Sequence, residues 1–366
     1  MTGRNVPRDR DRDRDREGAV RPGEELDVGA VDAWLKRRVP GLSETPVVTQ
    51  YSGGASNWTY RLKYPDHDLV LRRPPAGTKA KSAHDMRREF QVQKALAPLY
   101  PYVPEMVGLC DDPAVLGCDF YVMRRILGVI LRGNLPQGMS LGAVTARRMA
   151  LSVIDRLVEL HRVDPRAAGL ESLGKGPGYA RRQIVGWSDR YRKARTWNVP
   201  RFEAVMTWLE RNTPDDVAYC VIHNDFRLDN VVLDPGDPTR VVGILDWEMA
   251  TLGDPLMDLG NSLAYWVEAG DDPIGRAIRR QPTHLPGMPT RREVVEYYLD
   301  RMGLPPIDVT FYEVYGIFRL AVIAQQIYYR YHHGQTKNPA FRRFWALAHY
   351  LEWRCRKLIP RRTTGG

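Results

Sequence analysis

The stretch that decides the fold is His223-Asn-Asp-Phe-Arg-Leu-Asp-Asn-Val-Val-Leu-Asp234. It is preceded by a run rich in β-branched residues, 217–222, and followed by a second such run, Val241-Val-Gly-Ile-Leu245, which ends at Asp246. Short runs of this kind, separated by turn residues, are typical of strands. The sequence therefore predicts a polar loop between short strands, and a hairpin-like arrangement that brings Asp246 beside Asn230.

Three side chains of this stretch have the chemistry that phosphoryl transfer requires. That reaction needs a carboxylate beside the attacking hydroxyl group, and oxygen ligands that hold Mg²⁺ against the nucleotide phosphates. Asp225 supplies the carboxylate, whereas Asn230 and Asp246 supply two hard oxygen ligands. An Asp-x4-Asn pair alone usually serves turns or helix caps. The preceding His223, the aspartate at the strand end and the following Gly253-Asp-Pro-x-x-Asp258 make this set specific.

The segment 223–260 resembles the aminoglycoside phosphotransferase-like family of kinases, in particular the branch fused to some acyl-CoA dehydrogenases. The resemblance covers roughly residues 28–360. It implies an α+β, protein-kinase-like two-lobed fold, with a small β-rich N-lobe and a larger, mainly helical C-lobe. It also implies that Asp225 is the catalytic base, that Asn230 and Asp246 bind Mg²⁺, and that ATP donates the phosphoryl group.

Three neighbours of the predicted base have roles that the sequence leaves open. Arg227 is a candidate catalytic cation for the transition state, or else an exposed arginine of a solvated loop. His223 is expected to pack and brace the loop rather than to transfer protons, because a carboxylate already fills the role of base. The family commonly has glycine at the position of Asn224, so the loop backbone can differ here, although no ligand is lost.

An ATP-binding lobe is predicted upstream, beginning with a strand-turn-strand pattern at 47–62. The turn holds Ser52, Gly53, Gly54 and Asn57. Backbone N–H groups of such a turn reach phosphate oxygens without a Cβ in the way. A Gly-Gly hairpin by itself is ordinarily only a tight turn. Its place ahead of the other motifs favours the nucleotide-binding role.

Arg72 lies on the predicted strand 69–73, at the position where kinases carry a lysine that pairs with the α- and β-phosphates. An arginine can still bind phosphate, as a planar fork rather than as a point charge. The helix predicted over 82–96, with Ser82 as its cap, supplies Glu89 as the partner of Arg72. The alternative is a surface glutamate in an i,i+4 pair.

The run 119–125 is predicted to be an edge strand that leaves the first lobe and becomes the hinge that binds adenine. Tyr121 and Met123 are expected to line the purine. The predicted organisation is a disordered charged tail at 1–25, a nucleotide-binding N-lobe at 26–125, a catalytic and substrate-binding C-lobe at 126–360, and a C-terminal tail at 361–366.

Composition sets further limits. The chain has 366 residues, of which 43% are hydrophobic, and no apolar run reaches the ~18 residues that a membrane span needs. No apolar signal segment begins it, and its four cysteines show no metal-binding spacing. We therefore expect a cytoplasmic protein with free thiols and no membrane partner. The Arg-Asp alternation at 8–17 has little to bury and is expected to be disordered.

A formal net charge of +10 opens the alternative of a nucleic-acid-binding protein. No aromatic and basic platform for single strands and no recognition helix accompanies that charge, so no nucleic-acid partner is predicted. A second alternative is a pseudokinase that binds nucleotide without turnover, for which the arginine at position 72 is the relevant feature. A base and both metal ligands favour an active enzyme.

The acceptor is predicted to be a small molecule with a hydroxyl group. In the resembling kinases it binds between a helical insertion and the C-terminal helices, so Trp187 and Tyr191 with their neighbouring arginines are candidate contacts. Helical spacing predicts helices near 141–161, over 179–193 and from Asp258, and two long helices over 309–358. Because aminoglycosides are polycations and this chain is basic, a hydroxyacyl-CoA or similar metabolite is favoured over an antibiotic. An aminoglycoside kinase stays the alternative, and the sequence does not indicate the oligomeric state.

Overall fold

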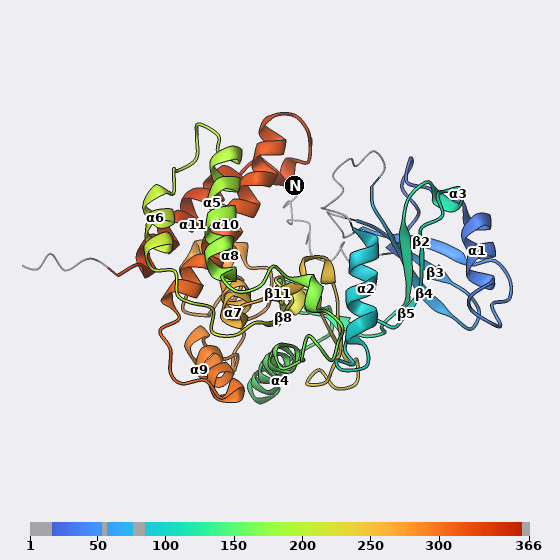
Figure 1. Cartoon of the computed structure of the whole chain (residues 1–366), viewed down its shortest axis with the longest axis horizontal. Coiled ribbons are helices and arrows are strands. Elements are labelled where there is room, and N and C mark those ends of the chain that lie inside the picture. Colours follow the sequence, from blue (N-terminus) through green and yellow to red (C-terminus); the bar gives the residue numbers. More distant parts are fainter. Residues whose placement is uncertain (1–16, 53–56, 76–84, 361–366) are drawn as a thin grey trace, which may run out of the picture. The chain divides into compact units, whose positions relative to one another are not determined.

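The computed structural model describes residues 17–52, 57–75 and 85–360. The chain forms two compact units (Figure 1). Unit 1 comprises Met1–Leu141 with Leu228–Glu248, and unit 2 comprises Gly142–Arg227 with Met249–Gly366. The sequence places the first boundary after residue 125, whereas the units divide at Leu141. The segment Leu228–Glu248 belongs to unit 1 because its two strands form a sheet with a strand that precedes Leu141.

Unit 1 contains a six-stranded antiparallel sheet with the strand order β1-β2-β3-β4-β6-β5. The strands predicted at 47–51, 58–62 and 69–73 are confirmed. The edge strand predicted at 119–125 is wrong, because the strand found there, β6, pairs on both sides, with β4 and with β5, and the edge strands are β1 and β5. The strands are β1 (Glu17–Gly18), β2 (Val47–Tyr51), β3 (Trp58–Lys63), β4 (Asp68–Arg73), β5 (Met106–Cys110) and β6 (Phe120–Arg124).

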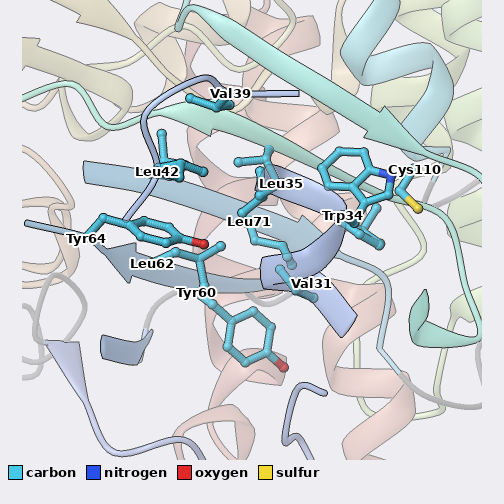
Figure 2. Close-up of a cluster of buried hydrophobic side chains, with 13 residues drawn as sticks. Val31, Trp34, Leu35, Val39, Leu42, Tyr60, Leu62, Tyr64, Leu71 and Cys110 are labelled. Atoms are coloured by element: carbon cyan, nitrogen blue, oxygen red, sulfur yellow. The ribbon is translucent and has the colours of Figure 1, made fainter. Parts of the chain in front are cut away.

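Two helices cover opposite faces of this sheet (Figure 1). Helix α1 (Val28–Lys36) buries Trp34 in a cluster that includes Leu71 of β4 (Figure 2). Helix α2 (Met86–Leu96) covers the other face, where Val70 of β4 lies in a second cluster. Successive β4 side chains thus alternate between the faces. The same alternation directs Arg72 toward α2. A short helix, α3 (Pro113–Leu116), completes this part of unit 1.

Helix α2 begins later than predicted. Its N-cap is Asp85, whose side chain accepts a hydrogen bond from the backbone N–H of Arg88. A capping carboxylate satisfies a first-turn donor and complements the helix dipole, which fixes the start at Met86. The cap predicted from the sequence, Ser82, lies outside the described residues.

The disorder predicted for residues 1–25 is wrong for the part that the structure describes. Glu17 belongs to β1, and its carboxylate accepts hydrogen bonds from Arg61 Nη1 at 2.7 and 2.9 Å. The backbone N–H of Arg21 donates to Gln50 Oε1 at 2.9 Å. These contacts attach the end of the charged segment to the sheet, a long-range pairing that the local charge pattern does not encode.

A second sheet of unit 1 joins β7 (Val129–Ile130), β9 (Val231–Leu233) and β10 (Val241–Ile244) in the order β10-β9-β7. Strands β9 and β10 form an antiparallel hairpin in which Val231 pairs with Ile244. The hairpin-like arrangement predicted from the sequence is therefore confirmed. A 3-10 turn, η2 (Leu228–Asn230), leads into β9, and another, η3 (Trp247–Met249), follows β10.

Unit 2 is mainly helical. Helices α7 (Pro255–Ala264) and α10 (Thr310–His332) pass so closely that a Cβ at Gly316 would lie 2.0 Å from the carbonyl oxygen of Gly260, which explains why both positions hold glycine. The helices predicted near 141–161 and 179–193 and the pair within 309–358 are confirmed. Helix α7 begins at Pro255, before the predicted start at Asp258, because the side chain of Asp254 caps it.

The remaining bounds in unit 2 are as follows. Strands β8 (Cys220–Ile222) and β11 (Thr251–Gly253) form a two-stranded antiparallel sheet. The helices are α4 (Ala143–His161), η1 (Glu171–Leu173), α5 (Tyr179–Ala194), α6 (Glu203–Arg211), α7 (Pro255–Ala264), α8 (Pro273–Ile278), α9 (Arg291–Met302), α10 (Thr310–His332), η4 (Pro339–Phe341) and α11 (Phe344–Leu358). All four cysteines are free thiols. Across residues 17–52, 57–75 and 85–360, none of the helices combines the length and the apolar character needed to cross a membrane.

Candidate active site

Unit 1 brings Arg72 of β4 and Glu89 of α2 together in a buried ion pair. The Glu89 side chain is 1% exposed and the Arg72 side chain 12% exposed. The pairing predicted from the sequence is therefore present, and the surface i,i+4 pair of Glu89 is excluded. Arg72 Nη1 also lies 3.4 Å from the hydroxyl of Tyr121.

Two more carboxylates surround the same guanidinium group. Arg72 Nη2 lies 3.4 Å from Asp246 Oδ1 and 3.8 Å from Glu248 Oε2. Burial alone would lower the pKa of Arg72, but Glu89, Asp246 and Glu248 raise it well above its ordinary value, so the group stays charged. Glu248 was not predicted from the sequence, although it stands in the Asp-Trp-Glu motif.

The two predicted metal ligands come from adjacent positions of the β9–β10 hairpin. The backbone N–H of Leu245 donates to the carbonyl oxygen of Asn230 at 2.8 Å, which fixes Asp246 one residue from that bond. Asp246 has a φ of +69°, a left-handed conformation that costs a non-glycine residue roughly 1–2 kcal/mol. Strain of this kind persists where the surrounding structure imposes it, and it concentrates at functional sites.

The residue types at this hairpin fit Mg²⁺. This ion is usually bound through one or two carboxylates, and substrate phosphates and waters complete its octahedron. The described residues contain no cluster of three or more His, Cys, Asp or Glu that could hold a metal. The amide of Asn230 and the carboxylate of Asp246 are residue types that suit this kind of site.

The predicted phosphate turn is described only at its ends. Gly53 and Gly54 lie outside the described residues, and Ser52 ends the described part of the β2 side. Asn57 is buried, and its Nδ2 lies 3.3 Å from Glu248 Oε2. On β6, Tyr121 is fully buried beside Arg72, and Met123 packs in the cluster under α2. Their predicted contact with a purine stays a prediction.

Unit 2 carries the predicted base. Asp225 Oδ1 lies 3.2 Å from Arg227 Nε, and the Arg227 guanidinium sits 4.6 Å from the ring centre of Tyr265. Both side chains are largely buried, so the open alternative of a solvated arginine is excluded for Arg227. His223 is buried, and its Nδ1 accepts a hydrogen bond from the backbone N–H of Asp225 at 3.2 Å. That contact fits the bracing role expected for His223.

Asp258 of α7 anchors the loop 223–227 that carries the predicted base, called the base loop from here on. Asp258 was named from the sequence only as part of a motif. Its carboxylate accepts hydrogen bonds from the backbone N–H groups of His223 at 2.7 Å and Asn224 at 2.8 Å. His161 Nε2 lies 3.2 Å from the same carboxylate. Burial alone would raise the pKa of Asp258, but the hydrogen bonds and charge of His161 and His223 hold it below its ordinary value.

The conformation of Asn224 shows how asparagine can replace the glycine that the family commonly has in this loop. Its φ is +65°, in the left-handed region where glycine is usual and asparagine is tolerated. Its side chain donates to the carbonyl oxygen of Met249 at 3.1 Å and accepts from the Tyr179 hydroxyl at 3.1 Å. The asparagine therefore adopts the glycine-like backbone and adds side-chain bonds to unit 2.

The candidate acceptor residues divide into core and candidate site. Tyr191 is fully buried, donates to the carbonyl oxygen of Pro200 at 2.6 Å and packs on Phe202. It is a core residue of α5. Trp187 is also largely buried, but two arginines, Arg190 and Arg319, lie against its ring. Arg190 was among the predicted arginine contacts. Arg319 was not predicted, because it belongs to α10, which is distant from α5 along the chain.

A cavity of about 270 Å³ in unit 2 is not part of the candidate site. Leu263 and Ala264 of α7 line it. The α7 residues that hold the base loop are Asp258 and Asn261, whose side chains contact residues 223 and 224. The lining of the cavity includes neither of these two residues and none of the site residues predicted from the sequence.

The antiparallel sheet of unit 1, its strand-to-helix ion pair and the helical unit 2 with its buried polar loop define a kinase-like fold. A model of the phosphotransferase enzyme family matches residues 47–294. The chain belongs to this family of phosphotransferases. The family and fold class predicted from the sequence are confirmed.

Similar proteins agree with this assignment. The chain is 36% identical to acyl-CoA dehydrogenase family member 10 of Mus musculus over 87% of its length, and 35% identical to family member 11 of Rattus norvegicus over 87%. These alignments span 30% and 41% of the relatives, so the chain covers less than half of each. A crystal structure from Ralstonia eutropha JMP134, named provisionally as an aminoglycoside phosphotransferase, has 30% identity and a TM-score of 0.75, and covers 92% of this chain and 100% of its own.

A choline kinase from Cryptosporidium parvum shares the fold alone. Its structure has a TM-score of 0.62 at 12% identity, and the match covers 90% of this chain and 96% of the kinase. The fold thus recurs at low identity around different acceptors, and the acceptor of this chain follows from its own residues rather than from the fold.

Proposed function

We propose that this protein transfers the γ-phosphoryl group of ATP to a hydroxyl group of a small molecule. The observation that carries the proposal is the β9–β10 hairpin, which joins Asn230 to the Asp246 segment while Asp246 contacts Arg72. A carboxylate and an amide beside a buried cation suit a metal-bound nucleotide phosphate. Mg²⁺, when bound there, would neutralise charge on the phosphate oxygens.

In this proposal Asp225 orients the acceptor hydroxyl and takes its proton. The hydroxyl oxygen forms a bond to the γ-phosphorus as the bond from that phosphorus to the bridging oxygen of ADP breaks. Arg227 supplies positive charge next to the base, and Arg72 holds the α- and β-phosphates as a planar fork. His223 and Asp258 act on the loop backbone, which they fix by hydrogen bonds.

The favoured acceptor is a hydroxyacyl-CoA or another metabolite that carries a phosphate or carboxylate group. Two observations support this class. The chain has a net charge of +10, which disfavours a polycationic antibiotic. The similar proteins named above are acyl-CoA dehydrogenase family members. The alternative of an aminoglycoside kinase rests on the name of the Ralstonia structure, and that of a nucleotide-binding pseudokinase rests on Arg72 in place of lysine.

A coupled assay of ATP consumption with Mg²⁺ tests the proposal. The parent and the Asp225→Asn protein are compared with 3-hydroxybutyryl-CoA, choline, glucose and kanamycin as acceptors. We expect an anionic acceptor to stimulate turnover in the parent and not in the variant. Stimulation by kanamycin alone would establish the antibiotic kinase. ATP binding by calorimetry without turnover on any acceptor would favour the pseudokinase.

A further inference from the structure

Arg319 of α10 is a buried arginine without a counter-charge. The residue is 3% exposed, and its guanidinium makes no hydrogen bond or ion pair with any other described residue. Its contact is with the indole of Trp187 on α5, at 5.2 Å from the ring centre. Arginine is rarely this buried unless it is paired, because an uncompensated charge in a low dielectric is costly.

A second cation approaches the same indole. The Arg190 guanidinium lies 4.5 Å from the centre of the Trp187 ring, and Arg190 is exposed. It too has no ion pair or hydrogen bond through its side chain within the described part of the chain. Two like charges around one ring repel each other, and attraction to an aromatic face is worth only about 0.5–2 kcal/mol each. The cluster therefore has an unbalanced positive charge that extends from the interior to the surface of unit 2.

A hydroxyl donor completes the cluster. Tyr315, one helical turn before Arg319, is fully buried, and its hydroxyl donates no hydrogen bond to another described residue. Burial raises the pKa of Tyr315 to about 12, so the phenol remains a neutral donor at physiological pH. An unpaired buried hydroxyl costs about 1–3 kcal/mol. Both unusual groups would be satisfied by one negatively charged oxygen.

The carboxylate of Asp258 influences this cluster electrostatically, but other groups already occupy its hydrogen-bonding positions. Asp258 influences Tyr179 and Tyr315, but its carboxylate is bonded to His161 and to two backbone N–H groups of the base loop. By contrast, Arg72 contacts Glu89, and Arg291 contacts Asp271 at 2.6 Å. Internal acids therefore neutralise those two arginines, whereas no acid among the described residues pairs with Arg319.

The cluster is also connected to the base loop. Tyr179 of α5 donates its hydroxyl proton to Asn224 Oδ1 at 3.1 Å, and the charge of Arg319 acts on Tyr179. Asn224 directly precedes the predicted base. A negative charge bound at Arg319 would therefore act electrostatically on the tyrosine that is hydrogen-bonded to Asn224, within unit 2.

We propose that Arg319, assisted by Arg190 and the Tyr315 hydroxyl, binds an anionic group, a carboxylate or a phosphate, of the acceptor. The inference rests on the proposed function and names residues that would select the acceptor. The rigid guanidinium fork suits two oxygens of one anion. Trp187 holds that fork by stacking. Arg319 and Arg190 bind and orient the acceptor in this view, whereas the chemistry belongs to the base loop.

Calorimetry with the full-length protein tests this site without requiring turnover. The probes are 3-hydroxybutyrate for a carboxylate, glycerol 3-phosphate for a phosphate, 3-hydroxybutyryl-CoA for both groups on a larger molecule, and glycerol as the neutral hydroxyl control. The variants are Arg319→Gln, which removes the charge, and Arg319→Lys, which keeps it. Arg330→Gln, an exposed arginine of the same helix, is the matched control. ATP binding and thermal unfolding are measured for each protein.

We expect at least one anionic probe to bind the parent, and Arg319→Gln to weaken it about tenfold to hundredfold, the range of a charge-assisted hydrogen bond. Arg319→Lys should restore part of this loss, and Arg330→Gln should show none. The unliganded Arg319→Gln protein should unfold at an unchanged or higher temperature, because it buries no unpaired charge. Equal binding by parent and Arg319→Gln, no binding of any anionic probe, or a loss that accompanies a lower unfolding temperature would overturn the proposal. Failure of the parent to bind ATP would instead contradict the proposed function.

Discussion

Two buried arginines show how differently the units use the same side chain. In unit 1, Arg72 is held by Glu89 and lies near Asp246 and Glu248, so its charge is balanced before any ligand arrives. In unit 2, Arg319 lies against Trp187 with no acid paired to it in the described structure. A balanced charge is fixed in position and keeps its orientation, whereas an unbalanced one attracts an external anion. The proposals above thus assign to unit 1 a ligand that brings its own cation, and to unit 2 an acceptor that brings negative charge.

We expect changes in the two units to affect separate steps of the reaction. Asp225→Asn, in unit 2, should lower kcat by about 10³-fold, within the range attributed to general bases. ATP binding should remain, because the proposed nucleotide contacts belong to unit 1. Single-turnover kinetics and calorimetry on one preparation measure both quantities. Equal loss of ATP affinity in this variant would contradict the separation of roles.

Asp258→Asn should have the next largest effect. The amide group of the variant would turn N–H donors toward His161 and the backbone N–H groups of the base loop, which are themselves donors. We expect the free energy of unfolding at pH 7 to fall by about 3 kcal/mol, the scale of breaking a buried charged interaction. Turnover should fall as well, since the base loop loses its anchor. Chemical denaturation of both proteins, with far-UV circular dichroism, checks the first expectation.

The pH dependence of that difference has a definite sign. The folded-state pKa of Asp258 is lowered, because His161 and His223 outweigh the effect of burial. Its contribution to stability is therefore present above the ordinary aspartate pKa of about 4. It is lost as the pH falls through the folded-state value. The parent and Asp258→Asn should thus become more alike below about pH 4, and a difference that grows on acidification would contradict this explanation.

The sequence predicted those parts of the molecule that depend on local pattern. Strand runs and the order of polar residues between 223 and 246 were sufficient for the β9–β10 hairpin, and helical spacing was sufficient for α5 and α10. The Arg72–Glu89 pair was also predicted, from family resemblance to a kinase plan. Its geometry is now visible, whereas the catalytic roles assigned to the residues remain proposals.

The features that were missed all depend on contacts between distant segments. The interior position of β6 follows from the pairing of β5, which has no distinctive pattern of its own. Glu17 is ordered by Arg61, although it follows a low-complexity run. Arg319 resembles any other arginine of an aromatic helix until the packing of α5 against α10 places it on Trp187, away from the acids of the described segments.

Glu89→Gln tests the role of the buried ion pair in unit 1. Arg72 would keep Asp246 and Glu248, so we expect an intermediate loss of about 2 kcal/mol in unfolding free energy, below the range for an isolated buried pair. ATP affinity should fall about tenfold, because the fork of Arg72 is no longer fixed. Denaturation and calorimetry measure the two effects.

The matched control for that change is Glu105→Gln. It breaks the exposed pair of Glu105 with Arg124, at 2.8 Å, and should alter stability by less than about 1 kcal/mol. If Glu89→Gln changed the free energy of unfolding as little as this surface variant, the buried pair would not be what positions Arg72. Arg72 and Arg319 would then not differ in the way described above.

The smallest expected effect is the stability difference between two variants at Asn224. It separates the strain in the backbone of the base loop from the loss of side-chain hydrogen bonds. Asn224→Ala and Asn224→Gly both delete the bonds to Tyr179 and Met249, but only glycine accepts a φ of +65° without strain. The glycine variant should therefore be more stable than the alanine variant by about 1 kcal/mol. The same pair of changes at Asn212, where φ is −110°, should show no advantage for glycine. Equal stability of the two Asn224 variants would mean that the loop relaxes on substitution, and that Asp258 does not hold its backbone as firmly as the two hydrogen bonds indicate.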